Sequence, residues 1–438
     1  MTEVITLGIG GAGVSVCHNL WDHYIQERDN NQEYEKYKQA VNFHEDSAGS
    51  YVPRGLFIDT DPTGTDLVQE SAIKHWFNDD HYSTGSDGTG TNYGEGRYTS
   101  GREQMPEIQD KLRKQAESCD SSPIVFMIAS SGGGTGSGLS DLICQDINDD
   151  FKIIRYNIYQ PPNTIGPANE CFNSIYSSWF SQEFAKFSIN IDNEQCTNIL
   201  NRLGISDPTY DDINTLISTN ISMVTAGNRF GSNNSYFASL ETSMIPYPRI
   251  NFMTSSFAPW EYTPTATKEF PSVSDITEDL FKCSNSLIST SSQESKIIAT
   301  NISYFGDVQT DDIKSSVENF RNSELNTFCD ATNKGIGTTK VELGEGCTRF
   351  SNKITDTLYN MKRSACILMS SQRAIEILER VSKTFDKLYH SRAYVFTYVG
   401  VGFESGEFSE CRECHAATIK DYEELGITIS EGDDDSFD

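Results

Sequence analysis

The chain has 438 residues, of which 37% are hydrophobic, and a formal net charge of −29 at pH 7. It is long enough for two or three packed units and apolar enough to bury a core, which excludes wholesale disorder. The acidic balance argues against a nucleic-acid-binding protein, because clustered Lys and Arg side chains are needed to meet phosphates, and it favours attraction of basic partners.

The apolar runs are short. The longest, such as residues 124–129, could not span a bilayer, and residues 1–4 carry an acid and no basic stretch of the kind that opens a secretory signal. We therefore expect a cytoplasmic protein without a membrane span, whose 11 cysteines are reduced. Residues 411–415 match the C-x-x-C-H pattern of haem attachment, but their acid-rich helical context favours two thiols on one helix face.

The first half of the chain alternates apolar strands with helices. Val14, Cys17, Leu20 and Tyr24 follow the first strand at helical spacings of three and four residues. Such alternation indicates an α/β fold with a parallel sheet. Four predicted strands end at loops rich in glycine, acid or proline: residues 4–9, 55–59, 124–129 and 153–158.

The second half mixes helical and strand-like runs from about Asp192, which predicts an α+β unit with a strand at residues 250–253. Residues 370–390 are strongly helical, with an apolar face and a charged face. A second helix is predicted from Glu407 to Glu424, with Gly426 as its stop. The last residues, 427–438, hold no Lys or Arg and are rich in acids, so we expect a solvated arm.

A glycine-rich turn follows the first strand. Gly8, Gly10 and Gly13 fit the pattern G-x-G-x-x-G between a strand and a helix. Glycines let backbone N–H groups approach a phosphate, and the helix N-terminus adds partial positive charge. A dehydrogenase would also need an acid about 20 residues further on, whereas the next strand-end acid is Asp59. An oxidoreductase is therefore a distant alternative.

A second glycine-rich loop follows the third predicted strand. Residues 132–138 contain five glycines together with Thr135 and Ser137. Two such loops at neighbouring strand ends predict a cradle for a polyphosphate. Neither loop has the Gly-Lys-Ser/Thr of a Walker A motif, so the phosphate charge has to be met by backbone N–H groups, helix dipoles and a metal ion.

Residues 130–138 resemble the tubulin signature loop, and the resemblance stays in register over nearly the whole chain. Residues 406–410 and 420–426 are similar to the end of α-tubulin rather than β-tubulin, and residues 341–365 resemble the α-type insertion that fills the taxane site of β-tubulin. The chain is thus identified as a divergent member of the tubulin family, of the α type. Further landmarks are residues 52–59, 98–103, 191–194, 208–210, 246–249 and 398–402.

The resemblance implies a structural GTP-binding protein that pairs with a β-type tubulin and polymerises head-to-tail into microtubules. GTP would be held at the interface within the dimer, with Mg²⁺ beside it. Motors and other microtubule-associated proteins would land on the acidic outer face, in the cytoplasmic cytoskeleton and the mitotic spindle. The implied units are a GTP-binding domain, an intermediate α+β domain, a C-terminal helical hairpin and an acidic tail, at residues 1–192, 193–369, 370–426 and 427–438.

The family's site residues can be carried over position by position. Asp59 and Asp61 end the second strand, and Asp61 would face the Mg²⁺. The γ-phosphate would be closed in by Thr89, Gly90 and Thr91. The phosphate-side positions are Gly10, Gly11, Ala12, Ser15, Ser130, Gly133, Gly134, Thr135 and Gly136.

The nucleoside would lie at the other end of the site. Glu170 would hold the ribose, and Tyr210 would stack on the guanine. The base edge would be read by Asn193 and Asn214, and the pocket would be completed by Ile158 and Ile217.

Several positions depart from the family pattern. Gly11 and Ser15 stand where relatives have Gln, so contacts to the phosphate and nucleoside are lost, and Gly88 replaces an acid near the Mg²⁺. In the lateral-contact loop, at about residues 259–271, Lys268 takes the place of a ring-bearing residue. These changes predict altered nucleotide affinity and altered contacts between protofilaments.

The sharpest departure concerns GTP hydrolysis. In the family, the α subunit supplies a glutamate that positions the attacking water on the GTP of a neighbouring β subunit. Counting back from Pro246 places that position at Ser239, and counting forward from Phe230 places it at Leu240. Either the helix is re-registered so that Glu241 acts in trans, or this subunit activates hydrolysis poorly; we favour the second. A division-type GTPase that forms single homopolymeric filaments is the runner-up for the whole chain.

Overall fold

The computed structural model describes residues 2–30, 41–46, 49–160, 167–230, 235–260, 271–290, 295–323, 328–329, 336–341 and 363–426. Three features named above lie wholly or mostly outside these ranges: the acidic tail, the lateral-contact loop with Lys268, and the α-type segment 341–365.

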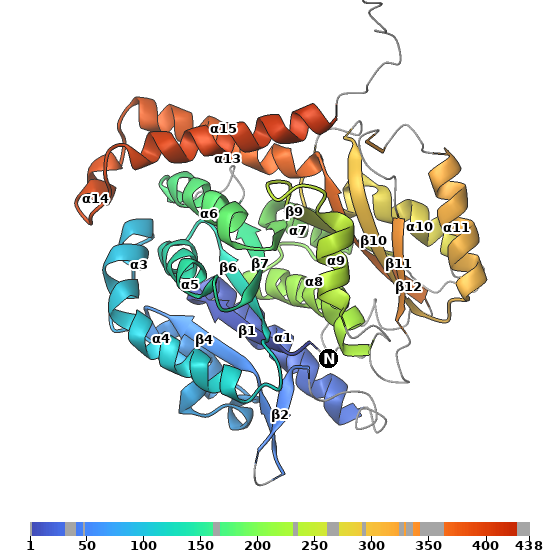
Figure 1. The fold of residues 1–438 in the computed structure, drawn as a ribbon, viewed down its shortest axis with the longest axis horizontal. Helices are drawn as coiled ribbons and strands as arrows, with labels where there is room; N and C mark the ends of the chain where they lie inside the picture. Colours follow the sequence, from blue (N-terminus) through green and yellow to red (C-terminus); the bar gives the residue numbers. More distant parts are fainter. Residues whose placement is uncertain are drawn as a thin grey trace, which may run out of the picture.

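One ten-stranded sheet runs through the described chain in the order β11-β10-β12-β9-β8-β7-β6-β1-β4-β5 (Figure 1). Strand β12 is antiparallel to both of its neighbours, and the other pairs of this sheet are parallel. The expected α/β fold with a mostly parallel sheet is thus confirmed. The strands are β1 (Val4–Ile9), β4 (Gly55–Asp59), β5 (Tyr82–Thr84), β6 (Ile124–Ser130), β7 (Lys152–Tyr159), β8 (Phe187–Asp192), β9 (Phe252–Ala258), β10 (Ile297–Gly306), β11 (Ile336–Val341) and β12 (Arg363–Ser371), with β2 (Phe43–Glu45) and β3 (Tyr51–Pro53) forming a separate pair.

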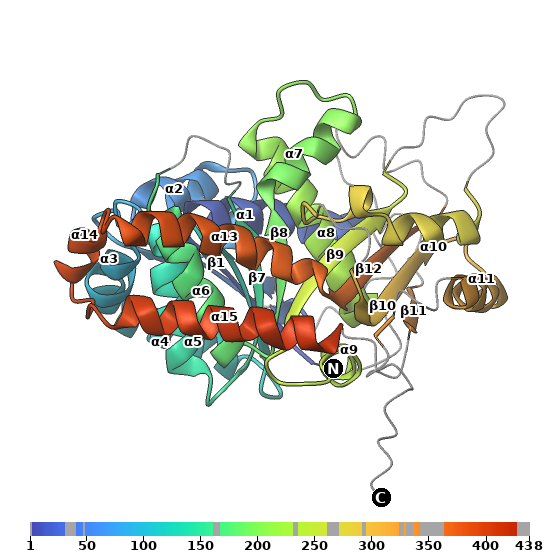
Figure 2. The same cartoon turned by 90° about the horizontal axis from the view of Figure 1, so that it is seen from above.

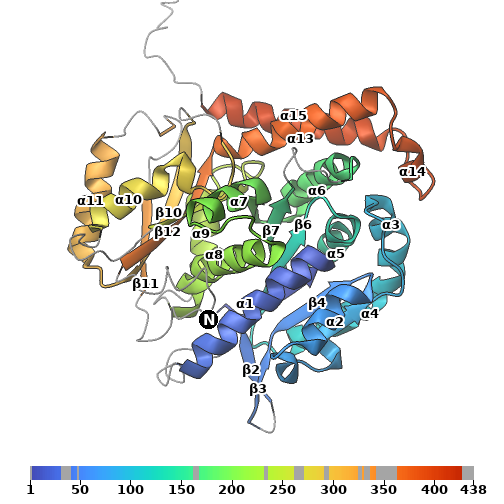
Figure 3. The same cartoon turned by 180° about the vertical axis from the view of Figure 1, so that it is seen from behind.

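Helices cover both faces of the parallel part of the sheet. Helices α1 (Gly10–Asn30) and α8 (Tyr210–Phe230) lie on one face (Figure 3), and α4 (Ser100–Glu117) and α5 (Ser140–Ile147) lie on the other (Figure 1). Side chains alternate along each strand, so Val4 packs in the α1 cluster while its neighbour Ile5 packs in the α4 cluster. Burial on both faces explains why these strands read as continuous apolar runs.

The C-terminal helices form an outer layer. Helices α13 (Arg373–His390) and α15 (Glu407–Leu425) lie side by side across α6 (Glu170–Phe184), as Figures 1 and 2 show. Phe172 of α6 packs against Phe385 and Phe408 of this layer. The remaining helices are α2 (Pro62–Glu70), α3 (Tyr93–Tyr98), α7 (Asn193–Arg202), α9 (Tyr236–Met244), α10 (Val273–Phe281), α11 (Thr310–Ser323) and α14 (Val395–Val399).

Two elements differ from the sequence expectation by two residues or more at one end or both. The helix expected from residue 370 begins at Arg373, because Ser370 and Ser371 still pair with neighbouring strands in β12. The strand expected at residues 250–253 begins at Phe252 and continues to Ala258. Both differences arise from strand pairing between distant segments, which local periodicity does not report.

The C-x-x-C-H segment is part of α15. Cys411 is fully buried, and Nδ1 of His415 lies 2.9 Å from Oγ of Ser382 in α13. Burial lowers the pKa of His415 to about 3. The segment therefore packs two helices together. No helix in the described parts of the chain is long and apolar enough to cross a membrane.

Candidate functional site

The strand order defines where a ligand should bind. The strand order reverses at β1, which has β4 and β5 on one side and β6, β7 and β8 on the other. In open parallel sheets, ligands bind at the carboxyl ends of the strands where the order reverses. Asp59 ends β4, Gly10 follows β1, and the second glycine loop follows β6. The predicted phosphate residues thus share one edge of the sheet.

The two glycine loops touch each other through their backbones. Gly10 has a φ of +71°, and a Cβ atom at this position would lie 2.8 Å from the backbone nitrogen of Gly136. A Cβ on Gly136 would lie 2.7 Å from the carbonyl oxygen of Ser130. Both positions therefore require glycine. A side chain on Gly10 would separate the two loops, and one on Gly136 would clash within the second loop.

The second loop does not run directly into an α-helix. Residues Thr135–Leu139 form a single turn of π-helix (the π-turn), and α5 begins at Ser140. A Cβ atom on Gly133 would have no neighbour within 4 Å, and Gly11 of the first loop is exposed. At Gly11 and Gly133 the loop backbones therefore face open space, as a phosphate cradle requires.

Threonine hydroxyls join three loops at this edge. Oγ1 of Thr135 lies 2.6 Å from Oγ1 of Thr60, at the end of β4, and 3.2 Å from Oγ1 of Thr89. Thr89 opens the segment expected to close over the γ-phosphate, in which Gly90 and Thr91 both have positive φ angles. The structure therefore brings this segment, the second glycine loop and the end of β4 together.

Two acids at the end of β4 differ in environment. Asp59 is 5% exposed, and its Oδ1 accepts a 2.8 Å hydrogen bond from the Thr60 backbone; burial raises the pKa of Asp59 to about 6. Asp61 caps α2, and hydrogen bonding from Thr63 lowers the pKa of its carboxyl group. The described residues hold no group of three His, Cys, Asp or Glu side chains suited to a metal. Asp61 fits Mg²⁺ that takes its remaining ligands from phosphates and water.

The residues expected to hold the nucleoside lie on the side of the second glycine loop where Gly132 stands. Glu170, the first residue of α6, is half-buried, and a Cβ on Gly132 would lie 3.5 Å from its Cβ. Burial raises the pKa of Glu170. Asn193 is 7% exposed, and its Nδ2 donates to Oε1 of Gln160 at 3.2 Å. Oδ1 of Asn193 is buried without a hydrogen-bond partner among the described residues, which fits an acceptor reserved for a ligand.

Helix α8 presents the residues expected at the base. Tyr210 begins this helix with 66% of its surface exposed, so its ring is free to stack on a planar group. Asn214 is half-buried one turn further along, and Ile217 is fully buried. Ile158 of β7 is also buried. The two isoleucines therefore contribute to the core beneath the site.

Ser15 lies one turn into α1, where its Oγ donates a 2.8 Å hydrogen bond to the carbonyl oxygen of Gly11. The hydroxyl is thus used within its own helix. Bonded in this way, the Ser15 hydroxyl does not replace the longer Gln that the family resemblance implies at this position.

Sequence reasoning missed two amides that join the loops. Nδ2 of Asn173, fully buried in α6, donates to the carbonyl oxygens of Gly132 and Thr91 at 2.7 and 2.8 Å. Nδ2 of Asn169 donates to the same Thr91 oxygen at 2.8 Å. Their spacing of four residues places both on one face of the helix start, which was the available signal.

Comparison with known proteins agrees with this geometry. Residues 3–201 match the Tubulin/FtsZ family GTPase domain, and residues 248–381 match the Tubulin C-terminal domain. The tubulin alpha chain of Pneumocystis carinii is 32% identical over 449 residues, covering 99% of each chain. The tubulin alpha-1 chain of Arabidopsis thaliana is 33% identical over the full length of both chains. The chain belongs to the tubulin family.

The tubulin alpha-3 chain of Saccharomyces cerevisiae is also 33% identical, over 97% of this chain and 98% of the relative. All of these relatives are α chains, so the resemblance to the α type is confirmed. As a tubulin, the chain is a GTP-binding structural protein of the cytoskeleton, and the open cradle described above is where GTP binding is expected.

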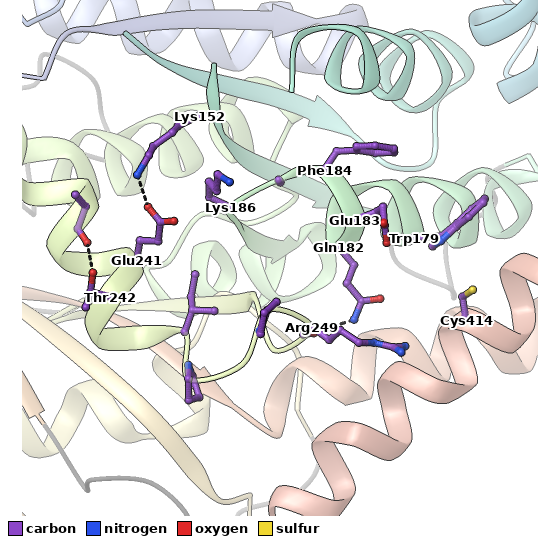
Figure 4. Close-up of a pocket in the computed structure, with 15 residues that line it drawn as sticks. Lys152, Trp179, Gln182, Glu183, Phe184, Lys186, Glu241, Thr242, Arg249 and Cys414 are labelled. Atoms are coloured by element: carbon purple, nitrogen blue, oxygen red, sulfur yellow. Dashed lines mark hydrogen bonds and ion pairs between the residues drawn. The ribbon is translucent and has the colours of Figure 1, made fainter. Parts of the chain in front are cut away.

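Helix α9 carries the residues considered for hydrolysis in this tubulin. Leu240 is 1% exposed and packs in the core, whereas Ser239 is exposed. Of these two, only Ser239 could therefore face a neighbouring subunit. Glu241 lies on another side of the helix, where its Oε2 forms a 2.9 Å ion pair with Nζ of Lys152 (Figure 4).

This ion pair borders a cavity of about 890 Å³ between α6, α9 and α15 (Figure 4). Lys152 begins β7 and Lys186 precedes β8, so the cavity lies at the amino ends of the strands. It is therefore at the opposite edge of the sheet from the glycine loops.

Proposed function

We propose that this tubulin acts as the α-type subunit of a heterodimer with a β-type tubulin, and that such dimers polymerise head-to-tail into microtubules. GTP would be held within the dimer, at the glycine cradle. The observation that supports this most strongly is the pair of touching glycine loops at one edge of the sheet, where Gly11 is exposed and the Cβ position of Gly133 is open.

A second subunit covering the cradle would also meet an apolar helix beside it. Phe396 of α14 is 76% exposed, and Val399 is 43% exposed. Nδ2 of Asn92, which follows the Thr89–Thr91 segment, donates to the carbonyl oxygen of Thr397 at 3.2 Å. Exposed apolar side chains tied to a nucleotide loop favour a protein partner there, and burial between two subunits would make the GTP a structural cofactor.

In this proposal the phosphates are held by backbone N–H groups of the residues 10–12 and 133–136, and Thr89 closes the γ-phosphate end. Asp61 would hold Mg²⁺, which supplies the positive charge that compensates the triphosphate. Asn193 would accept from the guanine edge through Oδ1, and Tyr210 would stack on the base. Asn214 and Glu170 would complete the contacts to the base and the ribose.

We further propose that this subunit activates hydrolysis poorly on a neighbouring β-type subunit. Ser239 has no carboxylate with which to orient a water molecule, and Glu241 is held by Lys152. Two residues turn a helix by about 200°, so Glu241 would point away from a subunit that Ser239 faces.

The outer layer of α13 and α15 would receive motors and other microtubule-associated proteins, in the cytoplasm and the mitotic spindle. Acidic side chains such as Glu410, Glu413 and Glu424 lie along α15 and suit basic partners.

The test is to express the chain with and without a β-type tubulin, extract the bound nucleotide, and examine the products by negative-stain electron microscopy. We expect guanine nucleotide and hollow, many-stranded filaments only with the partner. Single filaments formed by the chain alone would instead support the division-type alternative, and protein without guanine nucleotide or polymer would refute the proposal.

A further inference from the structure

A buried ion pair lies directly behind the second glycine loop. Asp141 is the second residue of α5, immediately after the π-turn, and its Oδ1 accepts from Nη1 of Arg155 in β7. The side chains are 0% and 1% exposed. Nη2 of the same guanidinium donates to Oγ of Ser140 at 2.9 Å and to Oγ of Ser177 in α6 at 3.1 Å. The pair thus joins α5, β7 and α6.

The same carboxylate also faces α3, the helix that follows the γ-phosphate segment. Tyr93 and Arg97 of α3 are near enough to act on the pKa of Asp141, which burial raises and the Arg155 guanidinium holds down. Arg97 in turn donates to Oε1 of Gln145 in α5. Asp141 therefore stands where α5, which follows the second glycine loop, meets α3, which follows residues 89–91.

The second glycine loop and α3 are packed backbone to backbone. A Cβ atom on Gly138 would lie 2.2 Å from the carbonyl oxygen of Tyr93, and one on Gly96 would lie 2.3 Å from that of Gly134. Gly136 and Gly138 bring no side chains to the π-turn, and glycine is the residue with the most conformational freedom to lose. The turn therefore relies on the contacts of Thr135, Ser137 and Leu139 and on the groups that hold the start of α5.

Stability alone does not explain the pair. Removing two charges from water is costly, and apolar side chains of similar volume often serve a core as well or better. A buried pair is better explained by the conformation that it selects, and this one selects the conformation of the residues that start α5.

We propose that Asp141 is a positioning residue for the GTP polyphosphate, which through Arg155 and α3 fixes the π-turn and residues 89–91 as one unit. The inference rests on the proposed GTP function and adds to it a residue that does not touch the nucleotide. Backbone dipoles act only at close range, so a cradle built from them loses its effect when it loosens. Binding of the phosphates should depend on Asp141, whereas binding of the guanosine moiety should not.

The experiment compares Asp141→Asn with the unaltered full chain by calorimetric titration with GTP and with guanosine. Each protein is purified without a β-type partner and stripped of nucleotide, because a partner would cover the cradle. We expect the affinity for GTP to fall at least tenfold and the affinity for guanosine to stay within twofold. Amide hydrogen exchange at residues 132–139 of the nucleotide-free variant should also become faster. Equal losses for both ligands, or no loss for either, would overturn the proposal.

Glu27→Gln is the matched control. Glu27 forms a buried ion pair with Arg229 at 3.0 Å, with side chains 5% and 3% exposed, between α1 and α8. It lies 17 residues after Gly10 on α1, or roughly 25 Å from the cradle at about 1.5 Å per residue. We expect a similar loss of thermal stability with an unchanged ratio of GTP to guanosine affinity. A ratio that falls as far in this control would also overturn the proposal.

A second variant covers the case in which Asp141→Asn does not fold. Asp141→Asn combined with Arg155→Gln removes both buried charges, and we expect the same selective loss of GTP affinity. A double variant with the unaltered ratio would show that the charge pair is not needed. If the unaltered chain itself binds no GTP, the proposed function fails, a result distinct from failure of the positioning role.

Discussion

Gly10→Ala is the most direct perturbation of the cradle. The residue stands at the end of β1 with φ at +71°, and its missing Cβ is 2.8 Å from the backbone nitrogen of Gly136. An alanine would therefore meet two penalties. It would occupy a left-handed backbone conformation, and it would push against a neighbouring backbone that cannot rotate away as a flexible side chain could.

The two penalties can be given rough sizes. A left-handed conformation costs an L-residue about 1–2 kcal/mol, and overpacking of a well-filled site costs about 1–3 kcal/mol, so the sum is about 2–5 kcal/mol. The entropy of unfolding is about 2.1 cal/mol/K per residue, or roughly 0.9 kcal/mol/K for 438 residues. The thermal midpoint should therefore fall by about 2–5 °C.

The assay is thermal unfolding of the nucleotide-free and GTP-saturated protein, followed by a GTP titration. We expect the lower midpoint together with a loss of GTP affinity of about tenfold, which corresponds to about 1.4 kcal/mol. Gly406→Ala is the control, because Gly406 has a φ of −72° and open space around its Cβ position. A Gly10→Ala protein as stable as the control and equally able to bind GTP would refute the cradle.

Three further predictions concern the rest of the site. Because burial raises the pKa of Asp59 from 3.8 to about 6, between these values the folded state keeps a proton that the unfolded state has lost, and this group's contribution to stability falls as pH rises through the window. Asp59→Asn should therefore raise the thermal midpoint of the nucleotide-free protein at pH 7.5 but not at pH 4, by about 1–3 kcal/mol in unfolding free energy; an equal shift at both pH values would contradict this. Asn193→Leu removes a buried acceptor and should weaken GTP binding by about 1–3 kcal/mol in a fluorescence titration, whereas unaltered affinity would exclude Asn193 from base recognition. In filaments, Glu241→Ala should leave GTP turnover within twofold of the unaltered protein, while Ser239→Glu should raise it by about tenfold or more; a slower Glu241→Ala protein would restore Glu241 as the activating residue.

The strands and the loops that end them could be predicted from the sequence because both are local features. Strands β1 and β4 have the predicted bounds, and β6 and β7 extend only one residue beyond theirs at one or both ends. Two glycine-rich segments after two parallel strands predict a shared edge for a physical reason, since parallel strands direct their carboxyl ends the same way. The family resemblance then supplied residue roles that spacing alone could not.

The residues that hold the cradle in place could not be predicted from the sequence in the same way. Asn173 bonds to two loops that lie 41 and 82 residues away in the sequence, and no local pattern reports such contacts. The π-turn depends on backbone packing between Gly138 and Tyr93 rather than on the propensities of its residues. One signal was present in the sequence: Arg155 interrupts an apolar strand, and a charge in a strand buried on both faces needs a partner.

The charge of the site explains why these supports are needed. The residues assigned to the nucleotide include three acids, Asp59, Asp61 and Glu170, and no Lys or Arg, in a chain of net charge −29. A lysine could follow a displaced phosphate on its flexible stem, but a backbone N–H group points in one direction and its dipole acts only nearby. A cradle of amides therefore has to be held more rigidly than one built on cations. In the proposed site, the glycine contacts, the threonine hydroxyls, Asn173 and the buried Asp141 pair would all meet that requirement, and we infer that GTP binding depends on the geometry of the loop backbone.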